Sequence, residues 1–304
     1  MKHDPILSSD QLIERATAIA NEGRRKTVAV AAAQDADVIG AVAQAQADGF
    51  LNGTLVGNEK RIRSLADESG IDLSQLTVIN EPDITKAAHT AIGLASDKKA
   101  DIIMKGFLAT SAILKVVLDK QYGLRGGNAL SHCAVLDIKG YDRLLNFTDG
   151  GMIVKPTTDQ KYQIIDNAVL VGRALGLSPV RVALSAVHDP SLLEKASTQI
   201  DDIVVEGPLS FEAATSATAA KISHPTSQVA GQADVYVVDS IEECNVVAKA
   251  LINFAEAVFC GVIVGARVPV SLVSRTDTIK NKKASLATAC VIADYYALNN
   301  VWEN

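Results

Sequence analysis

Short apolar runs rich in Val, Ile and Ala alternate with longer segments of helical period, and this alternation restricts the fold more than any other feature of the chain. Residues 27–33 (TVAVAAA) are typical of a buried strand, and residues 35–49 are typical of a helix that ends at a glycine. Further strands are predicted at 53–57, 75–80 and 100–106. Strands joined through helices lie parallel, so the pattern predicts an α/β fold with a mainly parallel sheet and helices on both faces.

The pattern changes over residues 132–154, where short strand-like pieces follow one another with turn residues between them. Antiparallel or mixed pairing is expected there, including a strand-like piece at 150–154 (GGMIV). Alternation resumes afterwards. We therefore expect a discontinuous first α/β lobe, residues 1–135 plus 268–304, and a second α/β lobe, residues 136–267, with a ligand cleft between them.

Composition narrows the function classes. The 304 residues are 48% hydrophobic and 4% aromatic, and the formal net charge is −6, which argues against a nucleic-acid partner. The four cysteines are scattered, so a zinc site or a disulfide framework is not expected. The N-terminus lacks a signal-peptide core and no apolar run is long enough for a bilayer, so we expect a soluble cytoplasmic protein without a membrane partner. The P-loop, GxGxxG, GxSxG and HExxH motifs are absent.

The segment 102–115 (IIMKGFLATSAILK) places Lys105 and Gly106 after a strand and Thr110 at the start of a helix. A helix N-terminus after a strand end offers N–H groups to an anion, and Lys105 and Lys115 can add positive charge. The same residues also suit an ordinary turn, with Thr110 as helix cap and both lysines in solvent. Spacing alone leaves both interpretations open.

Two further segments pose the same choice. In VVEGPL, Glu206 stands before a Gly-Pro turn and can be a base or a hydrogen-bond partner in a site, or the segment can be a simple turn. Asn245 and Lys249 are four residues apart, hence on one helix face, where they can orient and neutralise an anion or simply face solvent.

The run 270–285 (VSLVSRTDTIKNKKAS) ends a strand with Ser274 and Arg275, at the edge where α/β sheets bind ligands. Asp277 suits the N-cap of the last helix. A solvated helix face is the expected place of three lysines, Lys280, Lys282 and Lys283.

Taken together, these segments resemble the phosphate acetyltransferase/butyryltransferase family, and more closely its butyryltransferase branch. The matching segments span nearly the whole chain: DIIMKGFLATSAILK, LSH, YDRLLNFTD, VVEGPL, VAGQADVYVV, ALINFAEAVFCGVIVGA and VSLVSRTD. The resemblance implies two α/β lobes like those of isocitrate and isopropylmalate dehydrogenases. It also implies a homodimer or higher homo-oligomer that assembles through the second lobe.

The resemblance implies transfer of a short-chain acyl group between CoA and phosphate, with CoA or acyl-CoA and phosphate or acyl phosphate as partners. CoA is then a substrate, and no permanently bound cofactor and no metal are expected. Ser274 and Arg275 match the pair that binds phosphate and polarises the acyl carbonyl, and Asp277 is the candidate base because Asn281 stands where the acetyl branch has its Asp. The matching substrate-binding positions are Lys105, Gly106, Thr110, Lys115, Asn245 and Lys249.

Two departures stand out: Glu243-Cys244 replaces the Ala-Gly that commonly precedes Asn245, and His188 stands where related sequences often carry Glu. They motivate an alternative, a non-catalytic or regulatory CoA/acyl-phosphate binder of the same fold. A metal- and NAD(P)-dependent decarboxylating dehydrogenase is a further alternative, although its carboxylate cluster and nicotinamide loop are not visible in the sequence.

Overall fold

A computed structural model describes residues 3–187 and 189–302. Its chain forms two compact units: unit 1 comprises Met1–Ser9 with Asn128–Phe259, and unit 2 comprises Asp10–Gly127 with Cys260–Asn304. The breaks between the units fall at 127/128 and 259/260, whereas the sequence predicted boundaries at 135/136 and 267/268.

Unit 2 is built on a sheet with the strand order β3-β2-β1-β4-β11-β10. All neighbours are parallel except β10 and β11. The strands are β1 (Lys26–Ala31), β2 (Leu51–Gly57), β3 (Thr77–Asn80), β4 (Ile102–Lys105), β10 (Val258–Val264) and β11 (Val270–Ser271). The predicted parallel α/β arrangement is confirmed here, although β11 is only two residues long.

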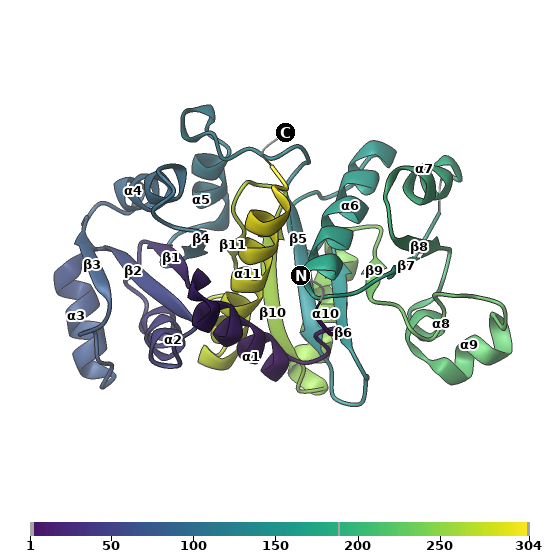
Figure 1. Ribbon diagram of the computed structural model, residues 1–304, viewed down its shortest axis with the longest axis horizontal. Helices are drawn as coiled ribbons and strands as arrows, with labels where there is room; N and C mark the ends of the chain where they lie inside the picture. The colour runs from purple at the N-terminus through teal and green to yellow at the C-terminus, as the bar shows by residue number, and fades with distance from the viewer. Residues whose placement is uncertain (1–2, 188, 303–304) are drawn as a thin grey trace. The chain divides into compact units, whose positions relative to one another are not determined.

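Helices cover both faces of this sheet (Figure 1). α2 packs against α11 on one face, and α4 packs against α5 on the other. The helical segments are α1 (Ser9–Ile19), η1 (Ala20–Arg24), α2 (Ala36–Ala47), α3 (Glu59–Glu68), α4 (Ile84–Ser96), α5 (Thr110–Val117), η2 (Lys120–Tyr122) and α11 (Ile279–Asn299).

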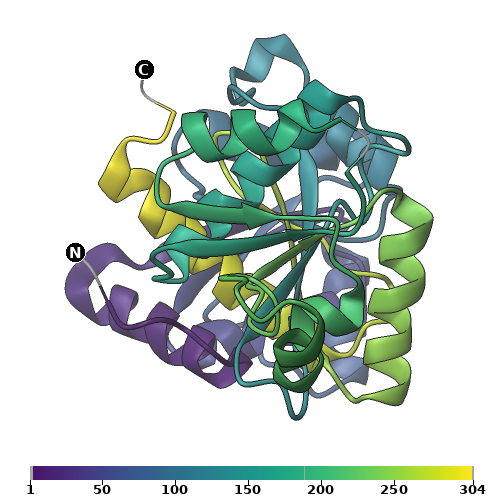
Figure 2. The same ribbon diagram turned by 90° about the vertical axis from the view of Figure 1, so that its right-hand side faces the viewer.

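Unit 1 is built on the strand order β5-β6-β9-β7-β8, in which β5 and β6 are antiparallel and the rest parallel. Its strands are β5 (Ser131–Asp137), β6 (Leu144–Thr148), β7 (Val180–Leu184), β8 (Ile203–Glu206) and β9 (Val235–Val237). Figure 2 shows α6 and α7 on one face and α8 and α9 on the other. These helices and α10 span Thr158–Ala174, Ser191–Gln199, Phe211–Thr215, Ala217–Ser223 and Ile241–Phe254. None of the helices in the described ranges is long and apolar enough to cross a membrane.

The predicted strand at 150–154 is wrong, because this segment is a loop. The buried carboxylate of Asp149 accepts hydrogen bonds from the backbone N–H groups of Gly151, Met152 and Ile153, at 2.8–3.2 Å. These donors would face a neighbouring strand if the segment were extended. The side chain of Asp149 therefore takes the place of a strand partner.

The long helix α11 is buried nearly all round, and one carboxylate in it holds two cations of unit 2. Asp294 accepts bonds from Arg24 Nε at 2.8 Å and Nη2 at 2.9 Å, and Lys26 Nζ lies 3.1 Å away. Burial raises the pKa of Asp294, but the hydrogen bonds and charges of Arg24 and Lys26 outweigh it, so the pKa is lowered from its ordinary 3.8. The cluster stabilises unit 2 while Asp294 is ionised.

We predict that Asp294→Asn lowers the free energy of unfolding by about 3 kcal/mol at pH 7, because it leaves the buried Lys26 and the partly exposed Arg24 without their carboxylate. The folded pKa is lowered, so the contribution is present above pH 3.8 and is lost as the pH falls through the folded value. Urea unfolding at several pH values measures this. Asp48→Asn, which removes a half-exposed partner of Lys283, is the control and should change stability by under about 0.5 kcal/mol. Equal effects of the two substitutions contradict the prediction.

Candidate functional site

Gly106 follows β4 at a point where the backbone leaves no room for a side chain. A Cβ atom there would lie 2.2 Å from the carbonyl oxygen of Ala32 and 2.7 Å from that of Ala31. The close approach lets Gly106 N donate to the Ala31 carbonyl at 3.0 Å and Phe107 N to that of Ala32 at 2.6 Å. The end of β4 is therefore fastened to the end of β1.

Lys105, the last residue of β4, is buried instead of solvated. Its Nζ lies 3.4 Å from the carbonyl oxygens of Gly106 and Leu108. Burial lowers the pKa of Lys105, and the positive charges of Arg275 and Lys282 lower it further, while Asp35 acts in the opposite direction. Several cations are thus held near one another, an arrangement that an incoming anion would relieve.

Helix α5 begins at Thr110 without a side-chain cap. Its N-cap position is Ala109, so the cap interpretation of Thr110 is wrong. Lys115 lies in the last turn of α5 and is exposed. Five residues on a helix correspond to a rotation of about 140°, so Thr110 and Lys115 do not share a face. The structure places Lys105, Gly106 and Thr110 in one short segment and leaves Lys115 away from it.

The segment Ser274–Asp277 forms a tight turn between β11 and α11. Asp277 is buried, and its Oδ2 accepts a hydrogen bond of 2.6 Å from Ser274 N. Asp277 N in turn donates to Ser274 O at 3.1 Å. The N-cap of α11 is Thr278, which accepts from Asn281 N at 3.2 Å, so the predicted cap role of Asp277 is wrong. The aspartate instead closes the turn that carries Arg275.

Arg275 is exposed, and its guanidinium lies over the ring of Phe107, 4.6 Å from the ring centroid. Phe107 directly follows Gly106, so the contact links the end of β11 to the end of β4. No carboxylate in the described ranges forms an ion pair with Arg275. Stacking on an aromatic face leaves the guanidinium N–H groups directed outward, where they can bind a phosphate or a carbonyl oxygen.

The three lysines after this turn have different positions. Lys280 is exposed, and Lys283 forms an ion pair of 2.7 Å with Asp48. Lys282, by contrast, is almost completely buried. The expectation of a solvated Lys282 is wrong, because its side chain turns back to the carbonyl oxygens of Arg275 and Asp277.

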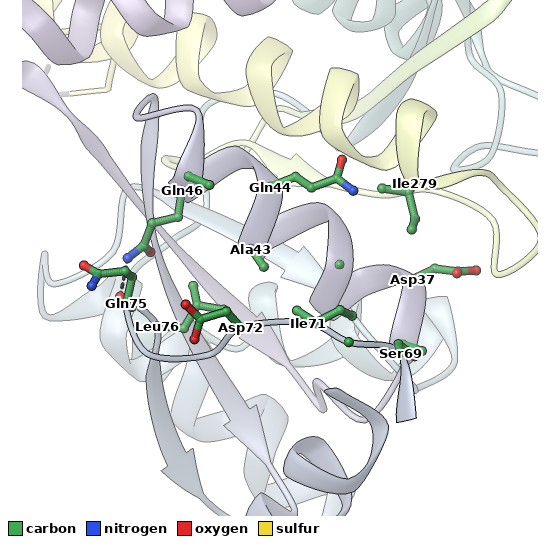
Figure 3. A pocket seen from close by; sticks show the side chains of 14 residues that line it. Asp37, Ala43, Gln44, Gln46, Ser69, Ile71, Asp72, Gln75, Leu76 and Ile279 are labelled. Atoms are coloured by element: carbon green, nitrogen blue, oxygen red, sulfur yellow. Dashed lines mark hydrogen bonds between the residues drawn. The ribbon is translucent and has the colours of Figure 1, made fainter. Parts of the chain in front are cut away.

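A groove of about 530 Å³ runs beside α2 in the same unit (Figure 3). Small residues of α2 line one side, and the segment from Ser69 to Leu76 lines the other. Asp37 and Ile279 stand together at one end, so this end adjoins the first turn of α11. Asp37 also lies 3.8 Å from Lys282.

In unit 1, Asn245 and Lys249 lie on α10 as the spacing predicted. Asn245 Nδ2 donates to Gly150 O at 3.2 Å, which ties α10 to the loop that Asp149 organises. Lys249 Nζ lies 5.8 Å from the centre of the Phe259 ring. Asp149 also accepts a hydrogen bond from His132 N at 2.9 Å. The same carboxylate therefore holds both the start of β5 and the loop that Asn245 contacts.

Both residues of the unusual pair Glu243-Cys244 contribute to the local structure at the start of α10. Glu243 Oε2 accepts from Asp239 N at 2.9 Å, and Ser240 Oγ accepts from Glu243 N at 3.2 Å, so Glu243 and Ser240 both cap the start of α10. Cys244 is buried beside Gly150. Its thiol pKa is raised to about 12, first by burial and then by the negative charges of Asp149, Cys133 and Glu243. The other departure, His188, lies outside the described residues.

Glu206 stabilises a turn. Its carboxylate accepts hydrogen bonds from the hydroxyl of Ser227 and from Gln228 N, the latter at 2.9 Å. This supports the structural interpretation of VVEGPL. Within the described ranges, no group of three His, Cys, Asp or Glu side chains is arranged to hold a metal ion.

Sequence reasoning gave no site role to four residues: Phe107, Lys282 and Asp35 in unit 2, and, separately, Asp149 beside Asn245 in unit 1. Phe107 had a signal in the sequence, since it stands within DIIMKGFLATSAILK, one of the segments that carried the resemblance. Asp149 stands within YDRLLNFTD, one of the segments that carried the resemblance.

An exposed arginine near a buried lysine at the strand ends of a parallel sheet defines an α/β protein suited to anionic ligands, and comparison with known proteins identifies its family. Residues 81–290 match the family described as Phosphate acetyl/butaryl transferase, and the chain belongs to this family of acyltransferases. It is 38% identical to the phosphate butyryltransferase of Clostridium acetobutylicum over 281 residues, 88% of this chain and 93% of the relative.

Solved structures agree. A branched-chain phosphotransacylase from Enterococcus faecalis superimposes with a TM-score of 0.76 at 28% identity, covering 88% of this chain and 99% of that one. A 4-hydroxythreonine-4-phosphate dehydrogenase from Klebsiella pneumoniae, 12% identical, gives a TM-score of 0.52 over 88% of this chain and 99% of that one. The second likeness concerns the fold alone and confirms the predicted dehydrogenase-like architecture.

We predict that Gly106→Ala lowers both stability and acyl transfer, because its Cβ would overlap the Ala32 carbonyl oxygen. A loss of about 2 kcal/mol or more is expected from thermal or urea unfolding. Gly93→Ala in α4 is the matched control, since its Cβ would meet nothing closer than 3.9 Å. The control should be neutral or stabilising by up to about 1 kcal/mol. A Gly106→Ala variant as stable as Gly93→Ala would contradict the close approach of β4 to β1.

We predict that iodoacetamide at pH 8 leaves Cys133 and Cys244 unmodified in the folded chain. Burial raises the pKa of each thiol to about 12, so only about one molecule in ten thousand carries the reactive thiolate. Mass spectrometry of digested protein reads the modification, and the chain unfolded in guanidinium is the positive control. Rapid labelling of folded Cys244 would show instead an accessible, activated thiol.

Proposed function

We propose that the chain transfers a short-chain acyl group between CoA and inorganic phosphate: acyl-CoA + phosphate ⇌ acyl phosphate + CoA, with butyryl-CoA or a similar short acyl-CoA as substrate. The observation that carries the proposal is the cationic cluster at the ends of β4 and β11, where Arg275 is exposed beside buried Lys105. The names of the related phosphate butyryltransferase and branched-chain phosphotransacylase support the choice of a short acyl chain.

The chemistry follows from this cluster. A phosphate oxygen attacks the thioester carbonyl carbon, a C–O bond forms, the C–S bond breaks, and the CoA thiolate leaves and takes up a proton. In reverse, the CoA thiol loses its proton and attacks the acyl phosphate. Arg275 is the candidate for the phosphate and the carbonyl oxygen, with Ser274 beside it, because a guanidinium can hold two oxygens at once. The buried ammonium of Lys105 adds positive charge near the developing negative charge.

Asp277 remains the candidate base for the CoA thiol. Its Oδ2 already accepts from Ser274 N, so the same carboxylate would both hold the turn and take the proton. Gly106 and Thr110 are proposed to line the phosphate site, and Lys115 is proposed as a more distant basic contact. Asn245 and Lys249 of unit 1 are proposed substrate contacts.

CoA enters this scheme as a substrate, without a permanently bound cofactor. We further propose a homodimer or higher homo-oligomer in the cytoplasm, with unit 1 as the assembling part. The assembling part is thus proposed to correspond to the predicted second lobe, residues 136–267, most of which lie in unit 1.

The alternative of a non-catalytic binder was motivated by Glu243-Cys244. Glu243 caps α10 and Cys244 packs beside Gly150, so both residues have a structural explanation that leaves catalysis possible. Family membership favours acyl transfer over a decarboxylating dehydrogenase. The functional test is phosphate-dependent release of free thiol from acetyl-, propionyl-, butyryl- and branched acyl-CoA. No release from any of them would refute the proposal.

We predict that Arg275→Ala lowers kcat/KM for butyryl-CoA and phosphate by about 10²–10³-fold, because a charge that stabilises the transition state is lost. Thiol release measured with a chromogenic disulfide reports the rate. The control is Arg63→Ala, which removes an exposed arginine of α3 that pairs with Glu59, and its rate should stay within about twofold. Near-normal turnover of Arg275→Ala would remove Arg275 from the mechanism.

A further inference from the structure

Lys282 is buried more deeply than either Lys105 or Asp277, and the acyl-transfer steps make no use of it. Its side chain is 1% exposed, although it lies in the first turn of α11. An ammonium removed from water is stable only where acceptors replace its lost solvation. The acceptors are the carbonyl oxygen of Arg275 at 3.4 Å and that of Asp277, with the Asp37 carboxylate at 3.8 Å.

These two carbonyl oxygens stand on either side of Thr276, so one ammonium group binds the backbone of both Arg275 and Asp277. From the other direction, Asp277 Oδ2 holds Ser274 N at 2.6 Å. The backbone of the turn is therefore fixed at three points, and the side chain of Arg275 leaves from between them. With its backbone fixed and its guanidinium stacked on Phe107, Arg275 has few orientations left.

Asp37 is a weak partner for Lys282. Its side chain is half exposed, and it faces the end of the groove beside Ile279 (Figure 3). The positive charge of Lys282 is consequently not cancelled locally, and it contributes to lowering the pKa of Lys105. The charge of Lys282 therefore acts on Lys105, while its ammonium group donates to the carbonyl oxygens of the Ser274–Asp277 turn.

We propose that Lys282 is a positioning residue for acyl transfer: it holds the Ser274–Asp277 turn so that Arg275 meets the phosphoryl group, and it does not touch substrate itself. The inference rests on the proposed function for the role of Arg275. If Lys282 acts only through Arg275, replacing Lys282 should lower the rate of the wild-type protein but should not lower it further once Arg275 has been removed.

The test is Lys282→Met, which keeps an unbranched side chain one atom shorter and removes the donors and the charge. We expect kcat to fall by about 10²-fold, as for a displaced catalytic group, with KM for CoA within about threefold. The double variant Arg275→Ala/Lys282→Met should lose no more than about threefold beyond Arg275→Ala. The control is Lys283→Met, which breaks only a surface ion pair and should stay within about twofold.

Amide hydrogen exchange gives a readout that does not depend on turnover. In Lys282→Met the peptide covering 272–279 should exchange faster while the rest of β4 and α11 keeps wild-type protection. If Lys282→Met does not fold, Lys282→Arg and Asp37→Asn replace it. Lys282→Arg keeps the charge but cannot present a compact ammonium to both carbonyl oxygens, so kcat should still fall. Asp37→Asn should change kcat only slightly.

Multiplicative losses in the double variant, or a folded Lys282→Met with kcat within about threefold of wild type and unchanged exchange, would overturn the positioning role. An inactive wild-type protein would refute the proposed function instead. In that case faster exchange in Lys282→Met would still establish that Lys282 holds the Ser274–Asp277 turn, and unchanged exchange would refute this role.

Discussion

The parallel pairing of β4 with β11 is the constraint on which the candidate site depends. Val270 lies opposite Ile103, and Ser271 lies opposite Met104, so two segments far apart in the sequence end side by side. Lys105 and Gly106 lie at the end of one strand, and Ser274–Asp277 come after the other. Strand β11 is only two residues long, and it is held between two neighbours, β4 on one side and β10 on the other.

The same constraint explains the electrostatics. Placing Lys105, Arg275 and Lys282 near one another is unfavourable without an anion, and the charge of Asp35 offsets only part of the cost, since the pKa of Lys105 remains lowered. Asp35 caps α2 through Val38 N at 3.0 Å, Asp37 is half exposed, and Asp277 is committed to the turn. An enzyme that must bind phosphate and release it benefits from such a site, since both buried lysines contact backbone carbonyl oxygens, and the carboxylate nearest Lys282, that of Asp37, is half exposed.

Much of this could be predicted from the sequence. The strand and helix periods indicated the α/β class, the parallel sheet of unit 2 and the antiparallel β5–β6 pair, because these depend on local patterns. The strand at 150–154 was wrong because the hydrogen bonds of that loop go to Asp149, a side-chain choice that hydrophobic period does not report. Residue type and position favoured Asp277 as a cap and offered Thr110 as one in one of two open interpretations, but neighbouring residues, Thr278 and Ala109, occupy those positions. The prediction that Lys282 is solvated was wrong, because this lysine is buried against carbonyl oxygens of a turn. The general preference of lysine for the surface does not reveal such acceptors.

The central claim, that this cationic cluster directs phosphate to a thioester, is tested most directly by phosphorus NMR of the wild-type protein with butyryl-CoA and inorganic phosphate. The account predicts a new acyl phosphate resonance that grows in step with free CoA and reverses when CoA is added in excess. Free CoA without acyl phosphate would show a hydrolase, and an unchanged spectrum would show a binder; either result would contradict the account.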